Sequence, residues 1–361
     1  MHTLPRSLFL SLFLFIFIMD IHAQSGGRGT YDFLTIPYSA RTTALGGDFL
    51  AIRDNDVTLV AANPSLITPA MNNNLGLGVV SVANAFTYGF ATFAHNFEKV
   101  GAFAATMEYI NYGDFQAADE SGNKTGNFNA GEYALIVGWG RSLSPLFSIG
   151  ANGKLIYSGL EDYNSFGFAV DVAGTYVSKS DLFSASLIAK NIGTQITTYT
   201  SGGREALPFE IQAGVSTKMK HIPLRFSFLY NHIERWDLSY YDPLDPENQV
   251  DPLTGTTKQK SGVSKFADNF MRHIVIGSEL TIAKVLALRL GYNYQHRQEM
   301  QLPQHKGLSG FSLGVGLRVK MFSFNYARTT YMSGGVNPNH FTISADLGAF
   351  SKKESAPEKT E

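Results

Sequence analysis

The sequence predicts an all-β fold, a 14-stranded antiparallel transmembrane outer-membrane β-barrel with an N-terminal plug segment. Apolar and polar residues alternate with period two in long segments, aromatic residues gather toward the segment ends, and the long connections share one parity. Most segments are roughly 10 to 15 residues long, where a usual strand has about 5 to 6. Long strands with aromatic ends fit a bilayer, although a secreted sandwich or solenoid remains the alternative. The predicted strands are 74–83, 86–97, 100–111, 128–142, 146–159, 163–178, 181–192, 207–219, 222–236, 268–282, 284–298, 307–319, 321–333 and 337–350.

The alternation assigns a face to each position of a strand. In the segment 311–320 every odd position is large and apolar, and every even position is small or polar. This pattern places Leu313 and Val315 toward lipid, and Ser312 and Gly316 toward the lumen. Three glycine pairs at strand spacing are predicted to be small lumen-facing positions: Gly76 and Gly78, Gly138 and Gly140, and Gly314 and Gly316. The other predicted lumen positions are polar or charged: Ser148, Asn152, Lys154, Asp171, Arg225, Asn231, Arg289, Asn293, Gln295, Arg318 and Asn325.

The connections between strands predict how the barrel is oriented. The joints after the even-numbered strands are tight, at 98–99, 144–145, 179–180, 220–221, 283 and 320. The long joints follow odd-numbered strands, at 112–127, 193–206, 237–267 and 299–306. Outer-membrane barrels have short periplasmic turns and longer outer loops. We therefore expect the long joints outside the cell and both ends of the barrel on the periplasmic side.

Three segments are predicted to lie outside the barrel of 74–350. Residues 1–23 carry a twelve-residue apolar run from Leu8 to Met19 and read as a signal peptide cut after Ala23, the alternative being an uncleaved anchor. Residues 24–73 are predicted to form the plug, with helix-compatible pieces at 40–45 and 56–62. Residues 351–361 form a charged tail that we expect to be disordered.

Composition excludes several functions. The chain has no cysteine, which excludes disulfides, iron–sulfur clusters and thiol chemistry. Its formal net charge is −1, so no basic field is available to bind nucleic acid, and we expect no nucleic-acid partner. Charged residues make up only 16% of the chain, where a soluble domain has about 25%.

The predicted plug contains three short motifs, YSARTTALGG at 38–47, RDND at 53–56 and ANPSL at 62–66. Gly46 and Gly47 permit positive φ and close backbone approach, and Asn63-Pro64 imposes an extended residue followed by a turn. Arg41 and Asp54 can form an ion pair in the lumen. These residue types favour a structural role for the motifs over a catalytic one.

The three motifs resemble the signature that opens outer-membrane proteins related to the FadL fatty-acid channel. Within that group the chain is most similar to the PorV and PorQ family of the Bacteroidota type IX secretion system, and YDFL at 31–34 is closest to its PorQ branch. The resemblance implies an outer-membrane barrel that anchors a surface protein similar to PorZ, in the attachment complex that fixes cargo to lipopolysaccharide. It implies no cofactor. The alternative is a FadL-like channel for hydrophobic small molecules.

Enzyme motifs are weak. Lys124-Thr125-Gly126 matches one box of the penicillin-recognising enzymes, but the sequence has neither Ser-x-x-Lys nor Ser-Asp-Asn, and we expect no enzymatic activity. A membrane-embedded hydrolase is the alternative. It would use histidines near the outer rim: His232, His273, His296 and His305.

The long joint 237–267 is the candidate partner-binding loop, because aromatic residues beside a long loop favour recognition. The residues that we single out are Trp236, Tyr240, Tyr241 and Pro243. The acidic run 242–251 is an alternative Ca²⁺ site, although its three prolines stiffen it and the order of an EF-hand is missing.

Overall fold

The computed structural model describes residues 29–82, 86–239, 262–300, 307–330 and 337–351. The predicted signal peptide, most of the charged tail and the acidic run 242–251 lie outside the described residues. Tyr240, Tyr241, Pro243 and His305 lie outside them as well.

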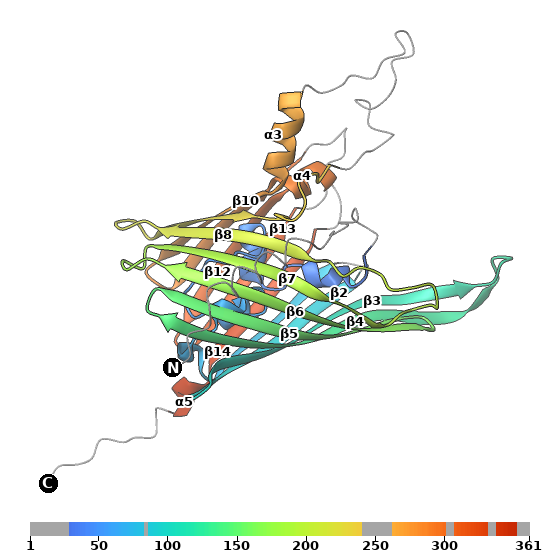
Figure 1. The fold of residues 1–361 in the computed structure, drawn as a ribbon, viewed down its shortest axis with the longest axis horizontal. Helices are drawn as coiled ribbons and strands as arrows, with labels where there is room; N and C mark the ends of the chain where they lie inside the picture. The colour runs from blue at the N-terminus through green and yellow to red at the C-terminus, as the bar shows by residue number, and fades with distance from the viewer. Residues whose placement is uncertain (1–28, 83–85, 240–261, 301–306, 331–336, 352–361) are drawn as a thin grey trace, which may run out of the picture.

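Fourteen antiparallel strands close into one barrel, as predicted (Figure 1). The first strand pairs with the last, with Asn74 opposite Asp346, so the sheet has no free edge. The strands are β1 Asn74–Val82, β2 Phe86–Phe97, β3 Gly101–Ala118, β4 Lys124–Ser144, β5 Phe147–Leu160, β6 Tyr163–Val177, β7 Phe183–Thr197, β8 Glu210–Lys218, β9 Leu224–Tyr230, β10 Ile274–Ile282, β11 Leu286–Asn293, β12 Phe311–Val319, β13 Phe322–Thr329 and β14 Asn339–Asp346.

Short helices precede, interrupt and follow the strands. Before β1 lie η2 Asp32–Thr35, α2 Ala40–Leu45, η3 Val57–Leu59, η4 Pro64–Leu66 and η5 Pro69–Met71. The helix predicted at 40–45 is confirmed: the Ser39 side chain caps its N-terminus and Gly46, at φ 97°, ends it. Among the described residues, no helix is long and apolar enough to cross a bilayer. The remaining helices are α3 Gly262–Arg272, α4 Tyr294–Met300 and α5 Gly348–Ser351.

The outer surface of the barrel is apolar and its inner face is buried. On β12, Leu313 is 59% exposed whereas its neighbour Ser312 is 2% exposed, and this alternation recurs around the wall. A wall of exposed Leu, Val, Ile and Phe side chains with a closed hydrogen-bond network is the surface that lipid requires. The chain is therefore an outer-membrane β-barrel.

The predicted parity of the connections is confirmed, but the long connections differ from expectation in detail. Residues 112–118 belong to β3 and 124–127 to β4, not to a loop, so that the two strands form a hairpin reaching far beyond the rim (Figure 1). Residues 268–272 belong to α3 and 294–298 to α4, where strands were predicted. Apolar residues in α3 recur at three- and four-residue spacing, which suits a helix and not a strand.

Candidate functional site

The segment 29–73, which we call the plug, lies inside the barrel (Figure 1). Its pieces reach different parts of the wall: α2 packs on β10–β14, η4 on β4–β6, and η3 and η5 on β1–β3. Most plug residues are buried, and 41–52 and 57–68 are buried throughout. The plug is thus the core around which the strands are arranged.

Glycines on the inner face make room for the plug backbone. A Cβ atom at Gly150 would overlap Pro64, and one at Gly291 would overlap Leu45. The predicted lumen positions are confirmed, since Gly76, Gly138 and Gly140 face the plug and Gly314 faces Ala44. Gly78 faces Phe90 across the wall, and Gly316 faces Arg289 and Asn325. Side chains at the closest positions would displace the plug.

The other motif residues hold the plug's turns. Asn63 accepts a hydrogen bond from the Ser65 N–H at 3.0 Å and donates from Nδ2 to the Leu50 carbonyl at 2.7 Å. Pro64 then begins η4. Gly47 lies against Leu229 and Val275 of the wall. These residues have the structural role that their motifs indicate.

Arg41 is the centre of a buried ionic cluster at the short-turn end. The expected pair with Asp54 is present, with Nη2–Oδ2 at 2.6 Å and Nη1–Oδ1 at 3.0 Å. Arg41 also donates to Asp56 at 2.9 Å, and to both carboxylate oxygens of Glu279 on β10 at 3.0 and 2.8 Å. All five guanidinium N–H groups therefore reach carboxylates, which fixes α2 to the wall.

Two further arginines from the wall complete this cluster. Arg225 of β9 donates from Nη1 to Asp54 at 3.0 Å and to Glu279 at 3.2 Å. Arg289 of β11 donates to Glu279 at 2.7 Å and to Asn325 at 2.8 Å. Burial acts to raise the pKa of the Asp54 carboxyl, but Arg41 and Arg225 outweigh it and hold that pKa well below its usual range. We call Arg41, Asp54, Asp56, Arg225, Glu279 and Arg289 the ionic cluster.

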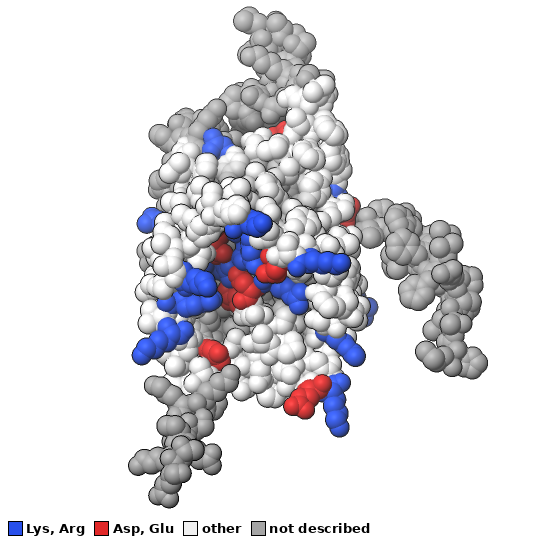
Figure 2. Space-filling model, turned by 90° about the vertical axis from the view of Figure 1, so that its left-hand side faces the viewer, with Lys and Arg blue, Asp and Glu red and all other residues white. Residues whose placement is uncertain are grey.

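The ionic cluster borders a cavity of about 710 Å³ that opens at the short-turn end. Lys284, Arg318 and Lys320 surround its mouth. Figure 2 shows basic and acidic side chains gathered around the hollow. This end of the lumen is polar, as the sequence predicts for Arg225, Arg289, Arg318 and Asn325, and it is open on the short-turn side.

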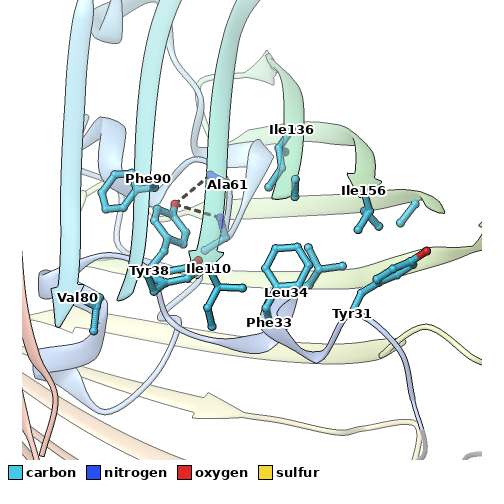
Figure 3. Close-up of a cluster of buried hydrophobic side chains, with 14 of the residues drawn as sticks. Tyr31, Phe33, Leu34, Tyr38, Ala61, Val80, Phe90, Ile110, Ile136 and Ile156 are labelled. Atoms are coloured by element: carbon cyan, nitrogen blue, oxygen red, sulfur yellow. Dashed lines mark hydrogen bonds between the residues drawn. The ribbon is translucent and has the colours of Figure 1, made fainter. Parts of the chain in front are cut away.

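A cluster of apolar side chains lies in the opposite half of the lumen, and this corrects the prediction of a polar wall throughout. Tyr31, Phe33, Leu34 and Tyr38 of the plug pack against inward side chains of β1–β5 (Figure 3). The Tyr38 hydroxyl accepts the Ala61 N–H at 3.1 Å, which joins two parts of the plug. We call this set the outer apolar cluster; its wall members include Val80, Tyr88, Phe90, Ile110, Ile136 and Ile156.

Between the two halves lie buried ion pairs. Lys154 pairs with Asp171 at 2.9 Å, and Lys190 pairs with Asp48 of the plug at 3.2 Å. The pairing of β6 with β7 is irregular between Val170 and Val172, and both Lys190 and Asn191 are buried there. Ser148 and Asn152 donate to plug carbonyls, at Ser65 and Ala61.

Sequence reasoning missed the wall partner of Arg41 and misplaced one lumen residue. Glu279 lies on the inward face of β10, two residues after Gly277. A charged residue at an inward strand position was the sequence signal that could have identified it as a partner of the plug. Gln295 is not on a strand but on α4. Asn293 is the last residue of β11 and donates to the Gly46 carbonyl at 3.2 Å. Asn231 comes directly after β9, not on it, and its N–H donates to the His273 carbonyl at 2.9 Å.

The predicted rim residues are only partly brought together. Trp236 is 45% exposed, with its ring 5.0 Å from that of Phe266 and 5.6 Å from that of His273. His232 pairs instead with Glu234 and Glu210, and His296 lies on α4. Within the described residues, no three His, Asp or Glu side chains are placed to bind a metal ion.

Fold and site together define a plugged outer-membrane β-barrel. No family model and no curated protein matches the sequence. Among solved structures, the Pseudomonas putida toluene transporter TodX is similar, at 13% identity and TM-score 0.48, covering 86% of this chain and 97% of that one. The CymD monoaromatic hydrocarbon channel is similar at 10% identity and TM-score 0.44, covering 86% and 96%. The KdgM porin follows at 6% identity and TM-score 0.33, covering 75% and 98%. All three TM-scores are below 0.5, so the assignment rests on the strand pairing and surface of this chain.

Proposed function

We propose that this barrel is a gated channel for small hydrophobic molecules, the FadL-like alternative of the sequence analysis. The outer apolar cluster carries the proposal. A channel for water and ions alone would not need Phe33, Phe90 and Ile136 inside the barrel. A channel for apolar solutes needs such an apolar surface. The channel needs no catalytic residue and no cofactor.

In this mechanism the plug is the gate. An apolar solute entering from outside would displace the side chains of Tyr31, Phe33 and Leu34, which separate the outer half of the lumen from the rest. It would leave through the periplasmic cavity. While the solute passes, the ionic cluster keeps the base of the plug attached to β9–β11. Only the part of the plug around Tyr31, Phe33 and Leu34 therefore moves, and the plug stays inside the barrel.

The proposal is tested by uptake in cells whose outer membrane lacks other channels for apolar solutes. Wild-type protein should increase uptake of a small aromatic hydrocarbon several-fold. Ile136→Asn places an amide in the outer apolar cluster and should abolish the increase, whereas the apolar Ile136→Leu should retain it. Heat-modifiable migration on gels verifies that each variant forms a barrel. Uptake that is equal with and without the wild-type protein would refute the channel.

A second candidate function is the surface anchor that the sequence resemblance implies. The projecting β3–β4 hairpin favours it, because a channel has no use for a rigid arm beyond its rim. Phe115 and Phe128 stiffen this arm, stacked with ring centroids 5.3 Å apart and planes at 17°. On this view the arm binds a PorZ-like protein of the type IX attachment complex at a lipopolysaccharide surface.

The anchor is tested by affinity purification of the tagged chain from solubilised outer membrane. Replacing 113–127 by a two-residue turn should release a surface protein that co-purifies with wild type, and should leave hydrocarbon uptake unchanged. Phe115→Tyr, which keeps the stacked ring, is the matched control. Co-purification that survives loss of the arm would argue against it.

A further inference from the structure

Helix α3 carries an exposed apolar side at the outer rim. Val263, Phe266 and Phe270 follow one another at spacings of three and four residues, which aligns them along one side of a helix. They are 81%, 60% and 42% exposed. Three large apolar side chains in this arrangement need a partner surface.

The polar side of α3 already has its partners within the protein. Asp268 accepts a hydrogen bond from Arg272 Nε at 2.9 Å, one turn along the helix. Its other oxygen accepts from the Tyr294 hydroxyl of α4 at 2.8 Å. At 3.6 residues per turn Asp268 lies on the side of α3 opposite Val263, Phe266 and Phe270, so its bond to α4 turns the apolar side away from α4.

The apolar side of α3 continues the lipid-facing surface of the barrel. The Phe270 ring is 6.1 Å from that of Tyr230, the last residue of β9. Tyr230 shares the outward face of β9 with Phe228, which is 44% exposed. Phe266 in turn packs on Trp236. An unbroken apolar surface therefore runs from β9 onto α3.

The wall beneath α3 is also short. β9 to β14 have 7 to 9 residues each, β9 with 7 being the shortest, whereas β4 has 21. At about 3.3 Å per residue and a tilt near 40°, seven residues span roughly 18 Å of the membrane normal, less than the usual apolar band of about 25 Å. The barrel thus lacks apolar height on the side where α3 is attached.

We propose that α3 lies in the interface of the outer leaflet, with Val263, Phe266 and Phe270 among acyl chains. The helix extends the lipid-facing surface where the strands are too short. Its partner is lipid, argued from continuity with the barrel exterior. This assigns Trp236 to the bilayer interface, where tryptophan is favoured, and not to a protein partner.

Trp236 provides a direct test, because the chain has only two tryptophans. Trp139→Phe leaves Trp236 as the single reporter, next to Phe266. The variant is reconstituted into vesicles of phosphatidylcholine brominated at shallow or deep acyl positions. We expect shallow bromines to reduce the Trp236 emission at least two-fold, and aqueous acrylamide to have a weaker effect than on free tryptophan.

A second set of variants tests the helix itself. In the Trp139→Phe background, Val263→Ser with Phe270→Ser should reduce quenching by brominated lipid by half or more and increase quenching by acrylamide. Lys265→Ser, outside the apolar set, should change neither. If lipid bromines leave the emission of the folded Trp139→Phe protein unchanged while acrylamide quenches it fully, α3 faces water or a protein, and the proposal is wrong.

Discussion

Arg41 in the plug and Glu279 in β10 lie 238 positions apart in the chain and form a two-pronged ion pair, with N···O distances of 3.0 and 2.8 Å. This pair joins the plug to the wall of the barrel. Both side chains are buried, so neither charge has water to replace its partner.

Arg41→Ala should loosen the plug. The substitution leaves Asp54, Asp56 and Glu279 close together with less positive charge, and loss of one partner of a buried pair typically costs about 3–5 kcal/mol. Hydrogen exchange of the α2 amides should become faster, corresponding to a local opening free energy lower by about that amount. Arg53→Ala, in the same plug but outside the ionic cluster, should have little effect. Unchanged exchange in Arg41→Ala would contradict this role.

Two glycines of β5 should respond differently to the same substitution. Gly150 faces Pro64, whereas a Cβ at Gly153 meets nothing within 4 Å. Gly150→Val should displace the plug and raise ion conductance in planar bilayers, because the valine and the η4 backbone cannot share the space. Gly153→Val should conduct as wild type does. Equal conductance of the two variants would show that η4 does not close the lumen.

A charged residue on the lipid-facing side of the barrel should lower the free energy of unfolding more when it lies closer to the middle of the bilayer. Val315 lies at the middle of β12 and Val319 at its end, and both are exposed on the outer face. Arginine should cost about 2–4 kcal/mol at Val315 and about 0–1 kcal/mol at Val319. Equilibrium unfolding from vesicles measures the difference. Equal costs would mean that β12 does not span the bilayer in this orientation.

The loop after β9 should become less stable as pH rises. Burial acts to lower the pKa of His232, but the hydrogen bond to Glu234 and the charge of Glu210 outweigh it, so the pKa lies above the usual 6.5. A raised folded-state pKa gives stability that is complete below pH 6.5 and is lost as pH rises through the folded value. Amide exchange at Ile233, corrected for its intrinsic pH dependence, should therefore show more frequent opening at pH 8.5 than at pH 6. His232→Gln should remove this dependence, and a variant that retains it would exclude His232 as the cause.

The sequence predicts the barrel well because apolar and polar residues alternate along its strands. In 311–319 the contrast between Leu313 and Ser312 identifies both the strand and its faces. The turn parity depends only on loop lengths, so it too can be predicted without three-dimensional information. The helix α2 follows from local signals, a serine cap and a terminal glycine.

The outer apolar cluster could not be predicted in the same way. At 133–137 the chain reads YALIV, so the inward Ile136 lies between two apolar outward residues and the contrast disappears. The pairing of Arg41 with Glu279 depends on how the plug is seated within the register of the closed barrel, which local sequence does not encode. The helix α3 was missed because Phe270 and Arg272 also fit the alternation of the following strand.

The pairing of β1 with β14 has a consequence for assembly. The plug immediately precedes β1 in the chain, and the seam between the first and last strands is the only place where the ring of fourteen described strands is completed. Because the plug is tied to the first strand of the seam, we expect it to be seated in the interior as the seam forms. The segment that fills the lumen is thus supplied by the same polypeptide, and the inward glycines leave the space that its backbone occupies.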